Sequence, residues 1–179
     1  MTPERAHLLA GLLDEMRTKD AGFIPDEAWL SVQATFAIPY VEVLILTKDS
    51  PPKFLLTYRE DASWKGWHIP GGIWYTKYTQ AEAVRSVARR ELGIDVKFVA
   101  EAMTEKWADH PYGNPISHVC IAKAKEPIKE TPKMRFFSNI PDGMIIHHRA
   151  FIERALEFES QRRDRADRDR KVRKFFGQK

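Results

Sequence analysis

The stretch GWHIPGGIWYTKYTQAEAVRSVARRELGI, residues 66–94, decides the fold. It begins with a Gly71-Gly72 turn and continues into a helix that we predict over residues 79–92. Thr79 is a suitable N-cap for this helix, and Gly93 a suitable stop. The apolar residues that line one side of the helix are Ala81, Val84, Ala88 and Leu92. The stretch reads as a metal-binding phosphate site that has lost most of its metal ligands.

The rest of the chain predicts a layered α/β domain. We expect helices at residues 3–18 and 26–34 and from residue 151 onward. Apolar, β-rich runs predict strands at residues 39–47, 53–58, 95–103 and 116–124. The turn cluster KDSPPK between the first two of these strands predicts that they form a hairpin.

The segment from Gly72 to Ile94 resembles the signature segment of the Nudix hydrolases, a loop–helix–loop that binds a divalent metal and a diphosphate. The family pattern is Gly, five residues, Glu, seven residues, then Arg-Glu-apolar-x-Glu-Glu-x-Gly-apolar. Its length matches this chain without a gap. The family's Glu, Arg-Glu and Glu-Glu positions fall here on Tyr78, Ser86, Val87, Arg90 and Glu91. The resemblance implies a Nudix-type α/β/α sandwich, a mixed central sheet between helices, over residues 25–158.

The resemblance also implies a metal site. Positions 87, 90 and 91 share one helical face, where the family's carboxylates bind Mg²⁺ or Mn²⁺. Only Glu91 remains an acid in this chain. We therefore expect one ion, held by Glu91, a carbonyl of Gly71 or Gly72, water and the substrate's phosphates. The alternative is that Glu91 is a solvated acid at a helix end.

The pattern is similar to that of the GDP-mannose mannosyl hydrolase branch of the family, where the signature segment also ends in a lone Glu before Leu-Gly. That branch implies attack at the glycosyl carbon of a nucleoside diphosphate-linked sugar, with release of the diphosphate. Arg59, which follows a strand, is then expected to neutralise the leaving group. Two rival hypotheses are ordinary pyrophosphohydrolysis and a Nudix-like module that binds a nucleotide without turnover.

The general base is not fixed by the sequence. The branch carries a His on the loop before the last strand, whereas residues 125–133 here contain no His, so Glu130 or Glu126 would have to serve. His147 and His148, which precede the last helix, are candidate bases near neutral pH. Helix capping or core packing is the alternative role for this pair.

Substrate-binding candidates lie on both sides of the glycine turn. Trp67 is a residue that can stack on a base or sugar, and Arg90 one that can contact phosphate. Glu42 lies in an apolar strand, where burial demands a partner or a functional role. The alternatives are ordinary packing for Trp67 and solvent exposure for Arg90.

Charge is concentrated at the C-terminus. Residues 161–179 hold nine Lys and Arg against three Asp, a local +6, although the whole chain has a net charge of +4. We expect an N-terminal helical extension (1–24), a Nudix domain (25–160) and a basic helical tail (161–179). The tail is either a solvated helical extension with interleaved Arg and Asp or an arm that contacts a partner subunit or a polyanion. Nucleic acid is not the expected partner, because the basic charge lies outside the predicted domain.

One cysteine, Cys120, excludes an internal disulfide framework. No apolar run reaches the ~20 residues that span a bilayer, and the first residues lack the design of a signal peptide. We therefore expect a cytoplasmic hydrolase of a small nucleotide-sugar. By family resemblance it is expected to be a homodimer.

Overall fold

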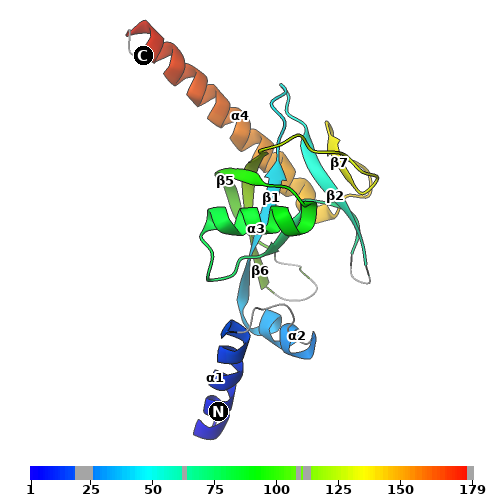
Figure 1. The fold of residues 1–179 in the computed structure, drawn as a ribbon, viewed down its shortest axis with the longest axis vertical. Coiled ribbons are helices and arrows are strands. Elements are labelled where there is room, and N and C mark those ends of the chain that lie inside the picture. Colours follow the sequence, from blue (N-terminus) through cyan, green and yellow to red (C-terminus); the bar gives the residue numbers. More distant parts are fainter. Residues whose placement is uncertain (19–25, 62–63, 108–109, 111–113, 177–179) are drawn as a thin grey trace.

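The computed structural model describes residues 1–18, 26–61, 64–107, 110 and 114–176. Figure 1 shows a central body with a helix projecting from each end. The elements in chain order are α1 (Pro3–Thr18), α2 (Asp26–Thr35), β1 (Ala37–Ile45), β2 (Phe54–Glu60), β3 (Lys65–His68), β4 (Gly71–Ile73), α3 (Gln80–Leu92), β5 (Val96–Lys106), β6 (Asn114–Ala124), β7 (Met134–Phe137) and α4 (Ile146–Phe175).

The strands form two sheets. The larger has the order β4-β1-β6-β5 and is mixed, because β1 runs parallel to β6 and antiparallel to β4. The smaller sheet, β3-β2-β7, is antiparallel. Residues along β1 are buried on both faces from Val41 to Ile45, as expected for a central strand.

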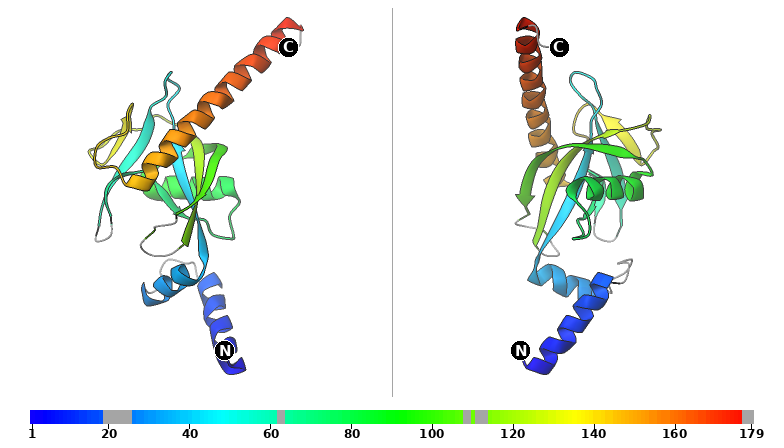
Figure 2. Two further views of the ribbon diagram at one scale, coloured as in Figure 1. Left: turned by 180° about the vertical axis from the view of Figure 1, so that it is seen from behind. Right: turned by 60° about the vertical axis from the view of Figure 1, so that its left-hand side comes forward.

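Helices cover both faces of the larger sheet. On one face Val41, Val43 and Ile45 pack with the apolar side of α3. On the other face Leu44 and Leu46 pack with Phe151 and the following turn of α4. The views in Figures 1 and 2 agree that α3 and α4 lie on opposite sides of the sheet. The predicted α/β/α sandwich is therefore confirmed.

The central helix is defined by its two ends. Glu82 accepts hydrogen bonds from the backbone N–H of Thr79 at 2.8 Å and from its hydroxyl at 2.7 Å. Gly93 adopts φ 67°, the left-handed conformation that favours glycine after a helix. Both ends agree with the sequence prediction to within a residue.

The predicted hairpin of residues 39–47 with 53–58 is wrong. β1 pairs with β4 and β6, and β2 lies in the other sheet, so that a single bridge, Leu46–Phe54, joins the two runs. The turn KDSPPK thus passes the chain from one sheet to the other. Gly71 and Gly72, which we expected in a turn, lie in strand β4 instead.

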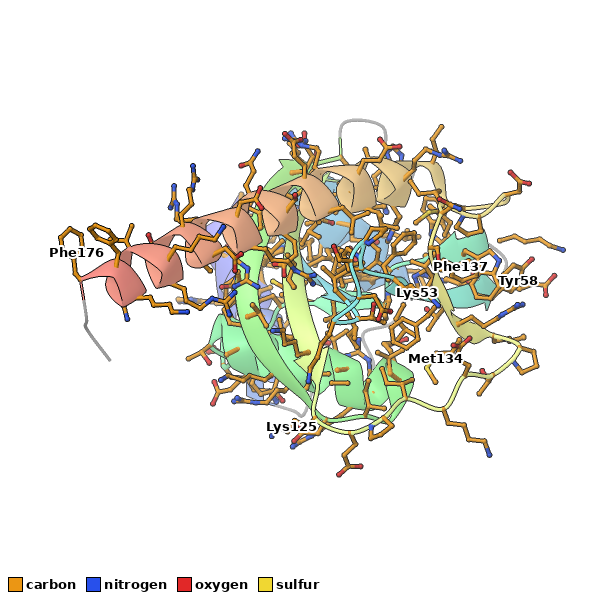
Figure 3. The ribbon with its side chains drawn as sticks, turned by 90° about the horizontal axis from the view of Figure 1, so that it is seen from above. Lys53, Tyr58, Lys125, Met134, Phe137 and Phe176 are labelled. Carbon is orange, nitrogen blue, oxygen red and sulfur yellow. The ribbon has the colours of Figure 1, made fainter. Side chains whose placement is uncertain are left out.

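α4 begins five residues before the predicted start, so that His147 and His148 lie in its first turn, and it continues into the basic tail as predicted. The carboxylate of Glu159, only 3% exposed, accepts hydrogen bonds from Arg162 at 2.6 Å and Arg163 at 2.8 Å. Arg163 also donates to the carbonyls of Thr47 at 3.2 Å and Asp49 at 3.0 Å. Figure 3 shows the helix running on to Phe176, far from Tyr58 and Met134.

The predicted boundary at residues 24/25 and the end of the predicted tail, 177–179, lie outside the described residues. Within the described part of the chain, no helix is both long and apolar enough to cross a membrane. The outward side of α1 carries Leu8, Leu9, Leu12 and Leu13, each at least 43% exposed.

Candidate active site

Strand β4 places two glycines between charged side chains from different elements. Successive strand residues face opposite sides of a sheet. A Cβ on Gly71 would overlap the Glu42 carboxylate and come within 2.8 Å of its Cδ. A Cβ on Gly72 would overlap the guanidinium of Arg90 and come within 3.2 Å of its Cζ. The glycines therefore give each charged group the space against β4 that a side chain would occupy.

Glu42 is a buried carboxylate, 5% exposed, on the face of β1 that also carries Leu44. Ser117 donates a hydrogen bond to its Oε1 at 3.1 Å, and Trp107 Nε1 donates to the Ser117 hydroxyl at 3.0 Å. Burial raises the pKa of Glu42 to about 7, although the Ser117 hydrogen bond opposes the rise. A carboxylate with this pKa can accept or release a proton near neutral pH.

Glu42 lines a small cavity of about 100 Å³, which we call the inner cavity. Its described lining residues include Glu42, Ser117, His68, His148, Trp107 and Arg59. Apolar and aromatic walls with a few polar groups are typical of a small-ligand site. His110 and Trp64 also line it.

His148 is held as a neutral ring. Its Nδ1 accepts a hydrogen bond from the backbone N–H of Ile69 at 3.0 Å, which leaves the proton on Nε2. Burial, with the nearby His68, holds its pKa well below the usual value. His148 thus suits the role of a fixed hydrogen-bond donor rather than the base we predicted. The ring of His147 packs on Trp107 with centroids 4.4 Å apart.

The end of α3 carries the expected metal donors, but a cation is already among them. Arg90 Nε donates to Glu91 at 2.8 Å, and Arg90 Nη2 lies 3.5 Å from the carbonyl oxygen of Gly71. Val87, which replaces another family acid, is 1% exposed and belongs to the core. Among the described residues there is no group of three or more His, Cys, Asp or Glu that could hold a metal ion. Because Arg90 contacts both expected donors, the residues in this arrangement do not fit a resident divalent ion.

Two open clefts adjoin the inner cavity, and Arg59 lines all three spaces. The Glu91 cleft, about 600 Å³, runs toward β7 past Glu91 and Lys133. The Arg90 cleft, about 670 Å³, runs along the side of β4 where Arg90 lies against Gly72. The described residues that line the Arg90 cleft are Trp29, Tyr40, Arg59, Gly72, Ile73, Tyr75, Lys77, Tyr78, Ser86 and Arg90.

The structure gathers some predicted site residues and leaves others apart. Glu42, Arg59, His148 and Gly71 meet at the inner cavity. Trp67 packs between Tyr58, at 5.3 Å, and Phe137, at 4.8 Å, and is not among the residues described as lining the three spaces. Figure 3 shows Tyr58 and Phe137 on the smaller sheet.

Glu130 and Glu126 are exposed on the segment before β7, and neither is among the described lining residues. Sequence reasoning missed Ser117, His68 and Tyr40. The available signal for Ser117 was a hydroxyl at an inward-facing position of an otherwise apolar strand.

The architecture is that of known hydrolase structures. The chain matches a UDP-X diphosphatase crystal structure with a TM-score of 0.59 and 17% identity, over 89% of this chain and 82% of that one. It matches a MutT Nudix hydrolase from Burkholderia pseudomallei with a TM-score of 0.56 and 18% identity, over 68% and 97%. The fold is that of the Nudix hydrolases. A MutT protein from Methanosarcina mazei Go1 matches at 0.54 and 20% identity, over 70% and 95%.

The Nudix fold assigns the Gly72–Ile94 segment its place: the end of β4, the helix α3 and the Gly93 stop. Among curated proteins, the low-salt glycan biosynthesis protein Agl8 of Haloferax volcanii is 34% identical over 74 residues, 41% of this chain. The match spans 46% of that relative's length. No family model matches the chain. The narrower resemblance to GDP-mannose mannosyl hydrolase stays a prediction.

Proposed function

We propose that this protein is a Nudix-fold hydrolase that cleaves a nucleoside diphosphate-linked sugar at the glycosyl carbon. The observation that carries the proposal is Glu42, a buried carboxylate with a pKa of about 7 that faces a cavity beside Gly71. A general base works best when its pKa is close to the operating pH. The glycan-biosynthesis relative supports a sugar-linked substrate.

The proposed reaction uses the chain's own groups. The Glu42 carboxylate accepts a proton from water, the water oxygen forms a bond to the anomeric carbon, and the bond from that carbon to the diphosphate oxygen breaks. The diphosphate leaves with the electron pair of the broken bond. Arg59, which lines the inner cavity and both clefts, stabilises that charge. Ser117 fixes one oxygen of Glu42, leaving Oε2 beside Gly71 for the water.

Attack at carbon agrees with the single carboxylate. A glycosidase that expels a sugar alcohol needs a second carboxyl group as acid. A diphosphate is a far better leaving group, so cationic stabilisation can take the place of that acid. Attack at phosphorus would bring a nucleophile toward an anion, and Glu126 and Glu130, the carboxylates that could add metal ligands, are exposed and not among the described residues that line the three spaces.

The test is product analysis in ¹⁸O-labelled water with a panel of nucleoside diphosphate-sugars. We expect the label in the free sugar and an unlabelled nucleoside diphosphate. Label in a phosphate group would assign the protein to pyrophosphohydrolysis and overturn attack at carbon.

A second candidate function is a nucleotide-binding module without turnover. Arg90 favours it, because an arginine in contact with Glu91 and the Gly71 carbonyl suits anion binding better than metal binding. Binding of the sugar nucleotide with no free sugar after prolonged incubation would establish the module and overturn the hydrolase.

The Nudix resemblance implied Mg²⁺ or Mn²⁺ and a homodimer, and the composition of the sequence predicted a cytoplasmic location. Nudix hydrolases generally use divalent metal ions, but no step of this proposal needs one, because Arg90 occupies the expected donors. We propose a homodimer in which the exposed leucines of α1 become buried. Light scattering on the intact chain and on a Leu8→Glu, Leu12→Glu variant tests this: a dimer that dissociates in the variant supports it, whereas a monomeric wild type overturns it.

A further inference from the structure

We propose that the guanidinium of Arg90 does the work of the divalent ion, so that the Arg90 cleft binds a diphosphate without metal. The inference takes its substrate class from the proposed function but concerns binding rather than turnover. It assigns the nucleoside diphosphate to the Arg90 cleft and the reacting sugar to the inner cavity.

Arg90 contacts both donors that an ion would use. Its Nε pairs with Glu91 Oε1 at 2.8 Å, and its Nη2 approaches the Gly71 carbonyl oxygen at 3.5 Å. The same guanidinium lies where a Cβ of residue 72 would stand, and glycine keeps that space open. An ion at this place would meet the positive charge of Arg90 at short range, which disfavours the ion as long as the guanidinium keeps these contacts.

The cleft itself has the composition of a nucleotide site. Its described lining residues include Arg59, Lys77 and Arg90. Arg59 pairs with Asp61 and Arg90 with Glu91, but neither carboxylate is among the described lining residues. Arginine donates two parallel hydrogen bonds to phosphate oxygens, a geometry that a point charge lacks. Lys77 lies over the ring of Tyr78 at 5.4 Å, so aromatic and cationic groups are interleaved.

Aromatic side chains form the rest of the wall. The described aromatic lining residues are Trp29, Tyr40, Tyr75 and Tyr78. Trp29 comes from α2, which precedes the sheet, so this helix closes one side of the cleft. Rings of this kind stack on a nucleobase whatever its identity. The cleft therefore suits a nucleotide whose diphosphate binds the arginines and whose base stacks on the aromatic rings.

The Arg90 cleft lies next to the inner cavity. Arg59 lines both spaces, and Gly71 and Gly72 separate them by the width of one strand. A ligand whose diphosphate lies on Arg59 and Arg90 can place its next group beside Glu42. The Arg90 residue therefore has a place in substrate binding that the family pattern, with an acid at this position, does not provide.

The experiment is calorimetry with inorganic pyrophosphate and with GDP, each in excess EDTA and in excess MgCl₂. We expect the wild-type chain to bind both probes in EDTA with an affinity similar to that in MgCl₂. Arg90→Ala is expected to weaken binding in EDTA roughly ten- to a hundredfold, the effect of losing a charge-assisted hydrogen bond.

Arg90→Glu restores the acid of the family pattern and provides the sharpest comparison. We expect it to lose binding in EDTA and to regain it in MgCl₂. The matched control is Arg89→Glu, which makes the same charge change one residue away, where Arg89 faces Asp95 at 3.3 Å with a 65% exposed side chain. The control is expected to bind like wild type in both buffers.

Several results would overturn the inference: loss of wild-type binding in EDTA with recovery in MgCl₂, equal effects of Arg89→Glu and Arg90→Glu, or no pyrophosphate binding in either buffer. Thermal melting of each variant identifies a chain that fails to fold. In that case Arg90→Lys, which keeps the charge but cannot donate two parallel hydrogen bonds, replaces the misfolded variant. Metal-free binding without hydrolysis would overturn the proposed function and leave this inference standing. Glycosyl-carbon hydrolysis by a chain that loses pyrophosphate binding in EDTA would do the reverse.

Discussion

The two faces of strand β4 lie beside carboxylates in different environments, one buried and one exposed and paired with an arginine. On the Gly71 face, Glu42 is buried, receives one hydrogen bond from Ser117, and has its pKa raised to about 7. On the Gly72 face, Arg90 lies against the strand and pairs at 2.8 Å with Glu91, which is 37% exposed. One strand, three residues long, separates a carboxylate suited to proton transfer from one neutralised by a cation.

The difference shows that burial, more than the presence of acids, determines what each side of β4 can do. Removing a carboxylate from water favours its neutral form. The family pattern concentrates acids on the α3 side. In this chain the carboxylate with a pKa near neutrality lies on the opposite side, on β1.

The largest expected effect comes from Glu42→Gln. Loss of a general base should lower kcat by roughly a hundredfold or more, with little change in KM, because the amide keeps the size of the side chain. Sugar release from the best nucleotide-sugar is the measurement. Glu101→Gln, a carboxyl-to-amide change on β5, is the matched control, and equal losses in the two variants would remove Glu42 from the mechanism.

The second prediction concerns stability and pH. The folded pKa of Glu42, about 7, lies above its ordinary value of 4.5, so the folded state prefers the proton. The stability that this group contributes is complete below pH 4.5 and is lost as the pH rises through 7, by about 3 kcal/mol.

Urea unfolding of wild type and Glu42→Gln between these pH values measures this contribution. Burial lowers the pKa of His68 and of His148, so these histidines make the folded state more stable as the pH rises. Both proteins contain them, so their contribution cancels in the difference, which isolates Glu42. A difference that does not vary with pH would contradict the raised pKa.

The two glycines give a third prediction. Gly71→Ala places a Cβ against the buried Glu42 carboxylate, which has little room to move, so we expect about 1–3 kcal/mol of destabilisation from overpacking. Gly72→Ala meets the far end of the Arg90 side chain, which is half exposed and can rotate away, so the cost should be smaller. Urea midpoints measure both, and equal costs would contradict the contrast between the two faces.

The smallest expected effect is that of Ser117→Ala. The Ser117 hydrogen bond lowers the pKa of Glu42, so its removal should raise that pKa further. A single hydrogen bond contributes about 1 kcal/mol, so the shift should be less than one pH unit. The pH dependence of kcat/KM, which rises as Glu42 loses its proton, should move to higher pH by that amount. A shift to lower pH would rule out Glu42 as the titrating base.

Local features of the fold were predictable from the sequence, and long-range pairings were not. The apolar spacing and the end residues of α3 are adjacent in the chain, so the helix could be predicted to within a residue. The partners of β1 are distant in sequence, and a turn cluster after it suggested the wrong neighbour. Parallel pairing of β1 with β6 leaves no local signal in either strand.

The candidate site was predictable in the same partial way. Arg90 and Glu91 could be placed on one helical face from spacing alone, but the contact of Arg90 with the Gly71 carbonyl depends on where β4 lies. Glu42 was recognisable as a costly polar residue in an apolar strand. Its position beside Gly71 follows from the β1–β4 register, which pairs the two residues directly, and its raised pKa follows from burial.

α4 gives the molecule a stiff arm. A helix of 30 residues is about 45 Å long, and the Glu159–Arg163 contacts attach it to the loop after β1 while Phe175 and Phe176, 86% and 70% exposed, lie at its free end. Figure 1 shows this end and α1 at opposite poles of the molecule. A surface that holds the arm would therefore fix the tilt of the whole body while leaving the mouth of each cleft open to diffusing small molecules.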